Sequence, residues 1–202
     1  MLIKELMILH ESEERSVLTV MGQQPEKLDG DFSCSGNQLT SLKGGPQKVG
    51  RDFYCYRNKL TSLEGCPQKV DGDFYCSNNQ LTSLEGGPRE VGGDFYCHNN
   101  KLTGLISLPQ KVGKDFDCSN NELTNLKDIH KHIKFIGNKA NFQDNPIKSH
   151  VVGLLLIDGL EKISMNNREV ETIINRHLSN GRDVLTCIDE LEEAGYSEFA
   201  KI

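Results

Sequence analysis

The sequence predicts a repeat solenoid in which a parallel β-sheet forms one face and turns form the other. Three observations favour this fold class. A unit of 21 residues recurs five times between residues 25 and 126, and each unit holds a short stretch of alternating polar and apolar residues. The segments outside the array follow the period of a helix. A unit this short cannot bury its own apolar side chains, so the units must stack.

Five kinds of residue mark each unit at fixed positions. Proline opens the unit, phenylalanine and cysteine follow two positions apart, asparagine comes three residues after cysteine, and two leucines close the unit. The markers other than leucine are Pro25, Pro46, Pro67, Pro88 and Pro109; Phe32, Phe53, Phe74, Phe95 and Phe116; Cys34, Cys55, Cys76, Cys97 and Cys118; and Asn37, Asn58, Asn79, Asn100 and Asn121. Stacking the units places each kind of residue in its own column.

Each unit contains a short strand with one buried face. Between residues 73 and 77 polar and apolar residues alternate, so we expect Phe74 and Cys76 to point into the core and Tyr75 to point toward solvent. Asn79 follows where the chain leaves the strand, and its amide can satisfy backbone groups that no sheet partner serves. The repetition therefore predicts a parallel sheet beside a column of asparagine hydrogen bonds, with turns completing each coil.

The cysteines indicate a reducing environment. Five of the seven belong to the repeat and share the buried side with the phenylalanines, as small hydrophobic residues do. Equivalent residues on neighbouring parallel strands lie about 4.8 Å apart, which is wider than disulfide Cβ separations prefer. A secretory signal is not evident, and the longest apolar run, residues 151–157, is too short to span a bilayer. We expect a cytoplasmic protein without a membrane partner.

Composition argues against several classes of ligand. The net charge is −6 and no basic stripe is present, so we expect no nucleic-acid partner. His130 and His132 stand close together without a cysteine or carboxylate cluster. The period of the aspartates also differs from that of calcium-binding glycine-aspartate repeats, which is about nine residues. We therefore expect neither a metal site nor a cofactor.

The repeat resembles the leucine-rich repeat family, whose consensus strand reads Leu-x-x-Leu-x-Leu-x-x-Asn-x-Leu. Phe74, Cys76, Asn79 and Leu81 stand in matching positions. The unit is most similar to the short bacterial class found in secreted type III effectors, and to a cysteine-rich variant in proteins of large tailed bacteriophages. This resemblance implies a phage-encoded binding protein that acts in the host cytoplasm.

The chain divides into three predicted domains. Residues 1–24 form an N-terminal helical cap with a half-repeat, residues 25–145 form the solenoid, and residues 146–202 form a helical capping domain. In the cap, Leu18 lies one period before Leu39 and is expected to share its core position.

The capping elements follow from local periodicity. An apolar stripe in the N-terminal helix is expected to cover the open end of the core. Its residues are Leu2, Ile3, Leu6, Met7 and Leu9. The residues expected to copy the phenylalanine, cysteine, asparagine and leucine positions in a degenerate terminal strand are Ile133, Phe135, Asn138 and Ala140. Helices are predicted over residues 147–156, 169–178 and 183–194.

The outward strand positions form columns that make up the candidate binding face. Four of the five tyrosines of the chain lie here, and tyrosine supplies large contact area at low entropic cost. The candidate partner-binding residues are Tyr54, Tyr56, Arg57, Tyr75, Tyr96, His98, Asp52, Asp73, Asp94 and Asp117. Stacked tyrosines could instead only stabilise the sheet. The aspartates fit a structural role, accepting hydrogen bonds from neighbouring turns, at least as well as recognition.

These observations predict a non-enzymatic protein that binds a host or viral protein through a concave strand face. Inhibition of a host defence protein is the function that such a binder would serve most economically. An alternative makes the solenoid a targeting arm for a C-terminal helical module that dimerises or acts as an effector. Cys187, Ile188 and Asp189 match the Cys-x-Asp triplet of effector ubiquitin ligases. The helical segment is too short for such a catalytic domain, and we predict no catalytic residue.

Overall fold

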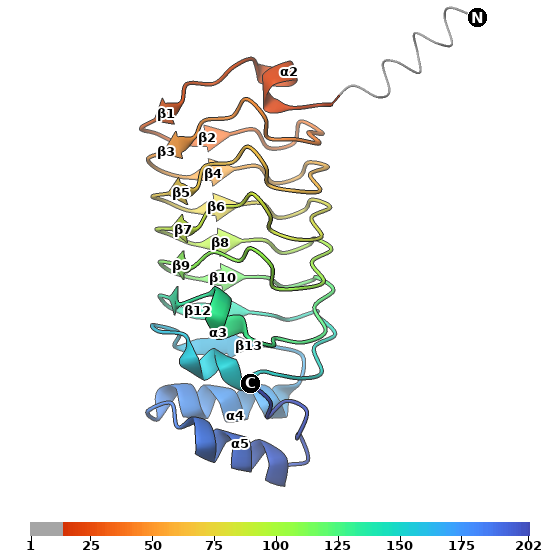
Figure 1. Ribbon diagram of the computed structural model, residues 1–202, viewed down its shortest axis with the longest axis vertical. Helices are drawn as coiled ribbons and strands as arrows, with labels where there is room; N and C mark the ends of the chain where they lie inside the picture. Colours follow the sequence, from red (N-terminus) through yellow and green to blue (C-terminus); the bar gives the residue numbers. More distant parts are fainter. Residues whose placement is uncertain (1–13) are drawn as a thin grey trace, which may run out of the picture.

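The computed structural model describes residues 14–202 and shows a solenoid whose coils stack along one long axis (Figure 1). The predicted fold class is confirmed: short parallel strands run along the stack and helices follow at its C-terminal end. The apolar stripe predicted for the N-terminal helix lies outside the described residues.

The predicted strands form a seven-stranded parallel sheet, here called the tyrosine sheet. Its strands are β2 (Phe32–Ser33), β4 (Phe53–Tyr54), β6 (Phe74–Tyr75), β8 (Phe95–Tyr96), β10 (Phe116–Asp117), β12 (Lys139–Asn141) and β13 (Lys162–Ser164). Phe53 pairs in register with Phe74, and Tyr54 with Tyr75, so one period of the sequence equals one step along the sheet. The alternation of buried and outward residues is therefore as predicted.

A second parallel sheet, here called the lysine sheet, forms where we expected turns. Its strands are β1 (Lys27–Leu28), β3 (Lys48–Val49), β5 (Lys69–Val70), β7 (Glu90–Val91), β9 (Lys111–Val112) and β11 (Phe135–Ile136). In each complete coil the valine is buried and the residue before it is exposed. Two residues are too few to show a strand period in the sequence.

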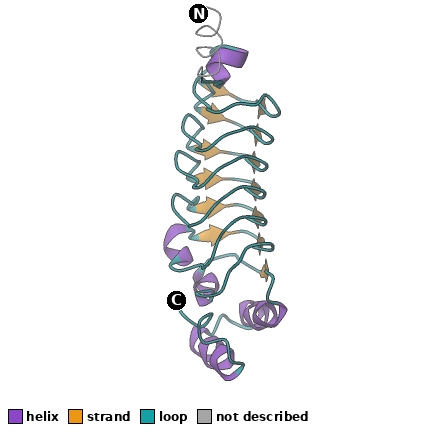
Figure 2. Ribbon diagram, turned by 90° about the vertical axis from the view of Figure 1, so that its right-hand side faces the viewer, coloured by secondary structure: helices purple, strands orange, loops and turns teal. Residues whose placement is uncertain are grey.

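The stack is straight in both views, so the tyrosine sheet is not concave as we expected (Figures 1 and 2). A horseshoe requires one side of each coil to be thicker than the other. Here both sides carry strands in the same coil-to-coil register, and parallel strands have one spacing. The coils therefore stack without a wedge, and the candidate binding face is flat.

Columns of identical side chains fill the core. The Phe53 and Phe74 rings lie 5.4 Å apart between centroids, and the Phe74 and Phe95 rings lie 5.3 Å apart, each pair nearly parallel. All seven cysteines are buried and unpaired. Complete burial of one phenylalanine contributes about 1.5–3 kcal/mol, so each coil is held mainly by its neighbours.

The predicted asparagine column is present and links successive coils. The Asn79 side chain donates to the carbonyl oxygens of Cys76 (3.1 Å) and Cys55 (3.0 Å), the second of which belongs to the preceding coil. Its oxygen accepts a hydrogen bond from the Leu60 backbone at 3.0 Å. Asn58, Asn100 and Asn121 repeat this pattern. Each amide thus satisfies buried backbone groups of two coils.

The register of the sixth coil differs from our prediction. Ala140 pairs with Phe116 and takes the phenylalanine position, in place of Ile133. Phe142 then lies in the cysteine position, with its ring 5.9 Å from that of Phe116. Asn145 is the asparagine of this coil, since its side chain donates to the Cys118 carbonyl at 2.9 Å. The small and large residues have exchanged places, which preserves the filled volume.

An insertion explains the misplaced register. Val112 pairs with Ile136, a spacing of 24 residues, whereas Val91 and Val112 are 21 residues apart. The additional residues form the short helix α3 (Ile129–His132), which anchors itself through the buried Ile129. Simple extrapolation of the 21-residue period therefore fails after residue 126.

The N-terminal half-repeat is also out of register. Residues Val17–Met21 form the short helix α2, and the Leu18 backbone donates to Lys43 rather than pairing near Leu39. Val17 is fully buried, while Leu18 is 40% exposed, so Leu18 does not take the expected core position.

The C-terminal segment begins with one more coil. Strand β13 pairs with β12, so the tyrosine sheet extends beyond the boundary predicted at residue 146. The helices predicted over 169–178 and 183–194 agree with α4 (Arg168–Ser179) and α5 (Val184–Glu193). The helix predicted over 147–156 forms only as the 3-10 helix η1 (Val152–Leu156).

Helix α4 closes the last edge of the tyrosine sheet. The Asn175 side chain accepts a hydrogen bond from the Ile163 backbone at 2.7 Å and donates to the Ile163 carbonyl at 2.9 Å. The Glu171 carboxylate accepts from the Met165 backbone at 2.8 Å. These side chains occupy the backbone groups that an eighth strand would use, so this edge cannot recruit another chain.

Replacing Asn79 with alanine tests the asparagine column. The variant leaves two carbonyl oxygens and one backbone N–H of the buried turn without partners, so we expect the free energy of unfolding to fall by about 3 kcal/mol. Urea denaturation followed by circular dichroism measures this loss.

The matched control is Asn78→Gly. Asn78 is exposed and has a φ of 56°, a conformation that glycine adopts readily, so we expect a change below about 0.5 kcal/mol. Equal losses in both variants would show that the buried amide is not what joins the coils.

Candidate functional site

The outward face of the tyrosine sheet carries a continuous stack of three phenol rings. Tyr54 and Tyr75 lie 4.8 Å apart between ring centroids, with an interplanar angle of 16°, and Tyr75 and Tyr96 repeat this geometry at 4.8 Å and 18°. Each ring is half-buried. The strand register forces the stack, because equivalent side chains on adjacent parallel strands are direct neighbours.

An aspartate column runs beside the stack and has a structural role. One carboxylate oxygen of Asp52 accepts a hydrogen bond from the Asp73 backbone at 2.8 Å, and Asp73 and Asp94 accept from the next coil in the same way. The chain closes at Asp115, which accepts from the Asn138 side chain at 2.6 Å. Of the two roles left open by the sequence, the structure gives these carboxylates the structural one.

The second carboxylate oxygen holds the tyrosine of the same strand. Tyr54 donates to Asp52 at 2.8 Å, Tyr75 donates to Asp73 at 3.1 Å, and Tyr96 repeats the bond to Asp94 at 3.2 Å. Every ring is therefore fixed by stacking on its neighbours and by one hydrogen bond at its tip.

These contacts raise the pKa of all three phenols. The hydrogen bond to Asp52, followed by burial, raises the pKa of Tyr54 to about 12. Burial and the Asp94 carboxylate raise the pKa of Tyr96 to about 12. The pKa of Tyr75 is also raised, first by burial and then by its bond to Asp73. The face therefore presents neutral phenols at physiological pH.

A third column places two more aromatic residues at the edge of the stack. Tyr56 lies edge-on to Tyr54 with ring centroids 6.3 Å apart, and His98 lies edge-on to Tyr96 at 6.1 Å. The corresponding residue between them is the small, buried Ser77.

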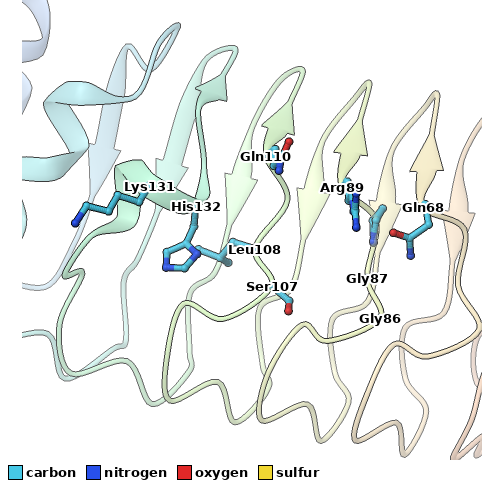
Figure 3. A pocket seen from close by; sticks show the side chains of 10 residues that line it. Gln68, Gly86, Gly87, Arg89, Ser107, Leu108, Gln110, Lys131 and His132 are labelled. Atoms are coloured by element: carbon cyan, nitrogen blue, oxygen red, sulfur yellow. The ribbon is translucent and has the colours of Figure 1, made fainter.

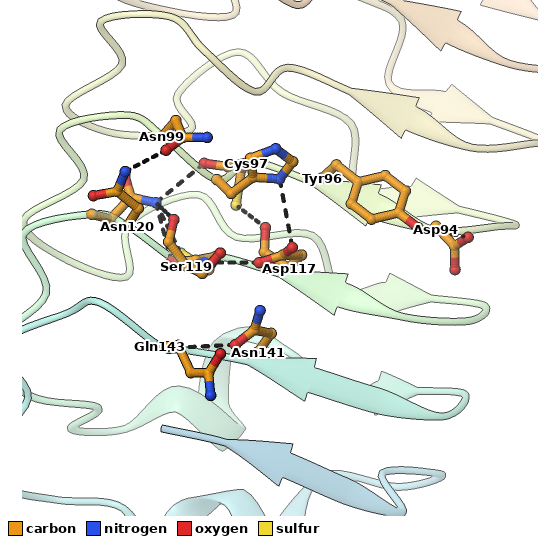
Figure 4. A network of polar contacts seen from close by, with 12 residues as sticks. Asp94, Tyr96, Cys97, Asn99, Asp117, Ser119, Asn120, Asn141 and Gln143 are labelled. Carbon is orange, nitrogen blue, oxygen red and sulfur yellow. Dashed lines mark hydrogen bonds and ion pairs between the residues drawn. The ribbon is translucent and has the colours of Figure 1, made fainter. Parts of the chain in front are cut away.

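Arg57 and Asp117 complete the predicted set. The Arg57 guanidinium lies 6.0 Å from the centre of the Tyr56 ring, in a turn where its backbone has a φ of 55°. Asp117 ends the tyrosine column, and its carboxylate lies 3.6 Å from Nδ1 of His98 (Figure 4). The structure thus brings all ten predicted residues together along one face.

The sequence reasoning missed how this face ends. Lys139 and Lys162 follow Asp115 in the aspartate column, because the three residues are aligned by strand pairing. The acidic column therefore becomes basic over the last two coils. The shifted register after α3 hid this change from the sequence pattern.

Cys187 does not have the environment of a nucleophile in this structure. Its side chain is fully buried, and burial raises the pKa of the thiol to about 11. Within residues 14–202, no cluster of three or more histidine, cysteine or acidic side chains is arranged to hold a metal ion. The helices of that same region are all too short or too polar to cross a membrane.

Comparisons of the chain with protein-family models, curated proteins and solved structures give no match. The leucine-rich repeat resemblance and the phage origin therefore stay predictions. Any functional argument has to come from the geometry of the face itself.

Replacing Asp52 with asparagine tests how the phenols are held. The amide oxygen can keep the bond to the Asp73 backbone, while the charged acceptor for Tyr54 is lost. We expect the pKa of Tyr54 to move from about 12 toward its ordinary value of about 10, as measured by ultraviolet absorbance during alkaline titration.

Stability should follow the same titration. Because the pKa of Tyr54 is higher in the folded chain, its stabilising effect is complete below about pH 10 and is lost as the pH rises toward 12. Asp117→Asn is the control, since Asp117 does not contact Tyr54. An unchanged titration curve for Asp52→Asn would contradict this account of the Tyr54 site.

Proposed function

We propose that this protein is a non-enzymatic binding protein that engages a protein partner through the outward face of the tyrosine sheet. The observation that carries the proposal is the stack of Tyr54, Tyr75 and Tyr96, whose rings are held by parallel stacking and by hydrogen bonds to aspartates. Tyrosine and arginine dominate the residues that contribute most to protein–protein affinity.

Rigidity favours binding over a purely structural role for the rings. Ordering a mobile side chain at an interface costs about 0.5–1.5 kcal/mol, and these rings are already ordered before a partner arrives. The hydrophobic core and the asparagine column already join the coils. A ladder of partly exposed aromatic rings therefore adds contact area at little further entropic cost on binding.

The chemistry of the face indicates what the partner offers. The aspartates spend their oxygens on backbone and phenol groups, so they contribute fixed dipoles more than free acceptors. Tyr56, Arg57 and His98 add aromatic edges and cationic or neutral donors around the stack. A flat protein surface with apolar side chains and exposed carbonyl or carboxylate groups complements this arrangement.

The finer part of the proposal rests on the resemblance alone. A phage-encoded binder of this kind would act in the host cytoplasm, where its buried free thiols stay reduced. Capturing a host defence protein through the tyrosine face would inhibit that protein by occlusion, without any chemical step.

The alternative function, dimerisation through the C-terminal helices, has one observation in its favour. Leu185 on α5 is 75% exposed, the highest value among the large hydrophobic residues of the described chain. An isolated exposed leucine is common on monomeric proteins and does not form a patch. Leu185→Glu, followed by measurement of the solution mass, would separate the two functions, because it leaves the tyrosine face intact.

A triple variant, Tyr56→Ser, Arg57→Asn and His98→Ser, tests the proposed face. Each new residue already occurs at the same position of another coil, as in Ser77 and Asn78, so the coils should stack unchanged. We expect proteins captured from bacterial lysates by the wild-type chain to be depleted at least about tenfold, measured by quantitative mass spectrometry.

The control variant is Lys48→Glu on the lysine sheet, which copies Glu90 of a later coil. It should capture the same proteins as the wild type. If the triple variant also retains them, the tyrosine face is not the binding surface.

A further inference from the structure

A polar hollow of about 460 Å³ lies on the turns beside the lysine sheet, away from the tyrosine face (Figure 3). Its lining residues are Gln68, Gly86, Gly87, Pro88, Arg89, Ser107, Leu108, Gln110, Lys131 and His132. This volume falls within the range of small-molecule sites, which is about 300–1,000 Å³.

The hollow arises where the repeat loses its paired glycine. At Gly86 the turn packs so closely on the preceding coil that an added Cβ would lie 2.5 Å from the Glu64 backbone nitrogen. Gly65 packs in the same way on the Leu42 backbone. The next coil has Ser107 and Leu108 in place of Gly86 and Gly87. A turn with side chains cannot approach as closely, so a gap opens between the two turns.

The insertion in the following coil supplies another wall. Helix α3 projects beside the altered turn and brings Lys131 and His132 to the edge of the hollow. Two departures from the repeat, the missing glycines and the inserted helix, therefore meet at one place. The regular coils before them pack without such a gap at the corresponding glycines.

The lining is rich in hydrogen-bond donors and lacks acids. The Gln68, Arg89 and Gln110 backbones are joined in sequence at 2.8 Å, which aligns their side chains on three successive coils. Within residues 14–202 the side chains of Arg89, Gln68, Gln110 and His132 make no hydrogen bond or ion pair with another protein group. No aspartate or glutamate of the described chain lines the hollow.

Lys131 contributes less directly. Its ammonium group is paired with Asp128 at 2.8 Å and is directed away from Arg89 (Figure 3). The uncompensated cation of the hollow is therefore the Arg89 guanidinium, the single arginine in a column otherwise composed of Gln47, Gln68 and Gln110 in the neighbouring coils.

From this geometry we propose that the hollow binds the phosphoryl group of a small phosphomonoester, with Arg89 as the principal contact. A guanidinium donates two parallel hydrogen bonds to phosphate oxygens. A carboxylate would be satisfied by Arg89 alone, whereas the three terminal oxygens of a phosphoryl group can also accept from Gln68, Gln110 and the Ser107 hydroxyl. The volume beyond the phosphoryl group accommodates a body of sugar size.

Two single variants test this site, and each introduces a residue that another coil already carries. Arg89→Gln restores the residue of the adjacent coils, and Ser107→Asp copies Asp128, which has the corresponding turn position with a φ of 60°. The first variant removes the cation and the second adds a repelling carboxylate. Neither change touches the core, so both proteins should fold.

Isothermal titration with ribose 5-phosphate as the probe, and ribose as the uncharged control, measures the effect. We expect the wild type to bind ribose 5-phosphate but not ribose, and each variant to bind at least about tenfold more weakly. Arg57→Asn removes one positive charge at a distant turn and should leave the affinity within about twofold.

Three results would overturn the proposal. They are no binding of ribose 5-phosphate by the wild type, unchanged binding by Arg89→Gln and Ser107→Asp, or equal weakening by Arg57→Asn. The last would indicate a non-specific response to net charge.

Discussion

The buried asparagine amide is the interaction on which the rest of the structure depends. Strands of two residues provide few backbone hydrogen bonds, and the turn that follows each strand carries N–H and carbonyl groups into the core. The Asn79 side chain satisfies those groups in its own coil and in the preceding one. Leaving them unpaired would cost about 1–3 kcal/mol each, more than the short strands could offset. The column therefore permits a coil of only 21 residues.

A second ladder, formed by Asp52, Asp73 and Asp94, performs the same service at the other end of each strand. The two ladders differ in where they lie. The asparagines are buried and act on backbone alone, while the aspartates lie at the surface and hold backbone with one oxygen and a tyrosine ring with the other. In this way a device that maintains the register of the sheet also orders the exposed face, so the stability of the scaffold and the geometry of the candidate site share one cause.

Much of this could be predicted because each repeated residue reports one environment five times. The buried phenylalanines and cysteines, the asparagine column and the outward tyrosines all follow from alternation and the fixed period. The lysine sheet could not be predicted, because a single valine between turn residues has no period. The register after Leu126 could not be predicted either, since the insertion at α3 moves the phenylalanine position to Ala140. The hollow near Arg89 depends on how closely two turns pack, which no residue pattern reports.

The side chains of α4 that close the tyrosine sheet contact the final strand and nothing earlier in that sheet: Asn175 bonds only to Ile163, and Glu171 to Met165. The terminator is therefore indifferent to how many coils precede it. Recombination between the near-identical units of such a gene could shorten or lengthen the array while both ends remain intact. Natural variants of different length would then display shorter or longer rows of phenol rings on an otherwise unaltered scaffold.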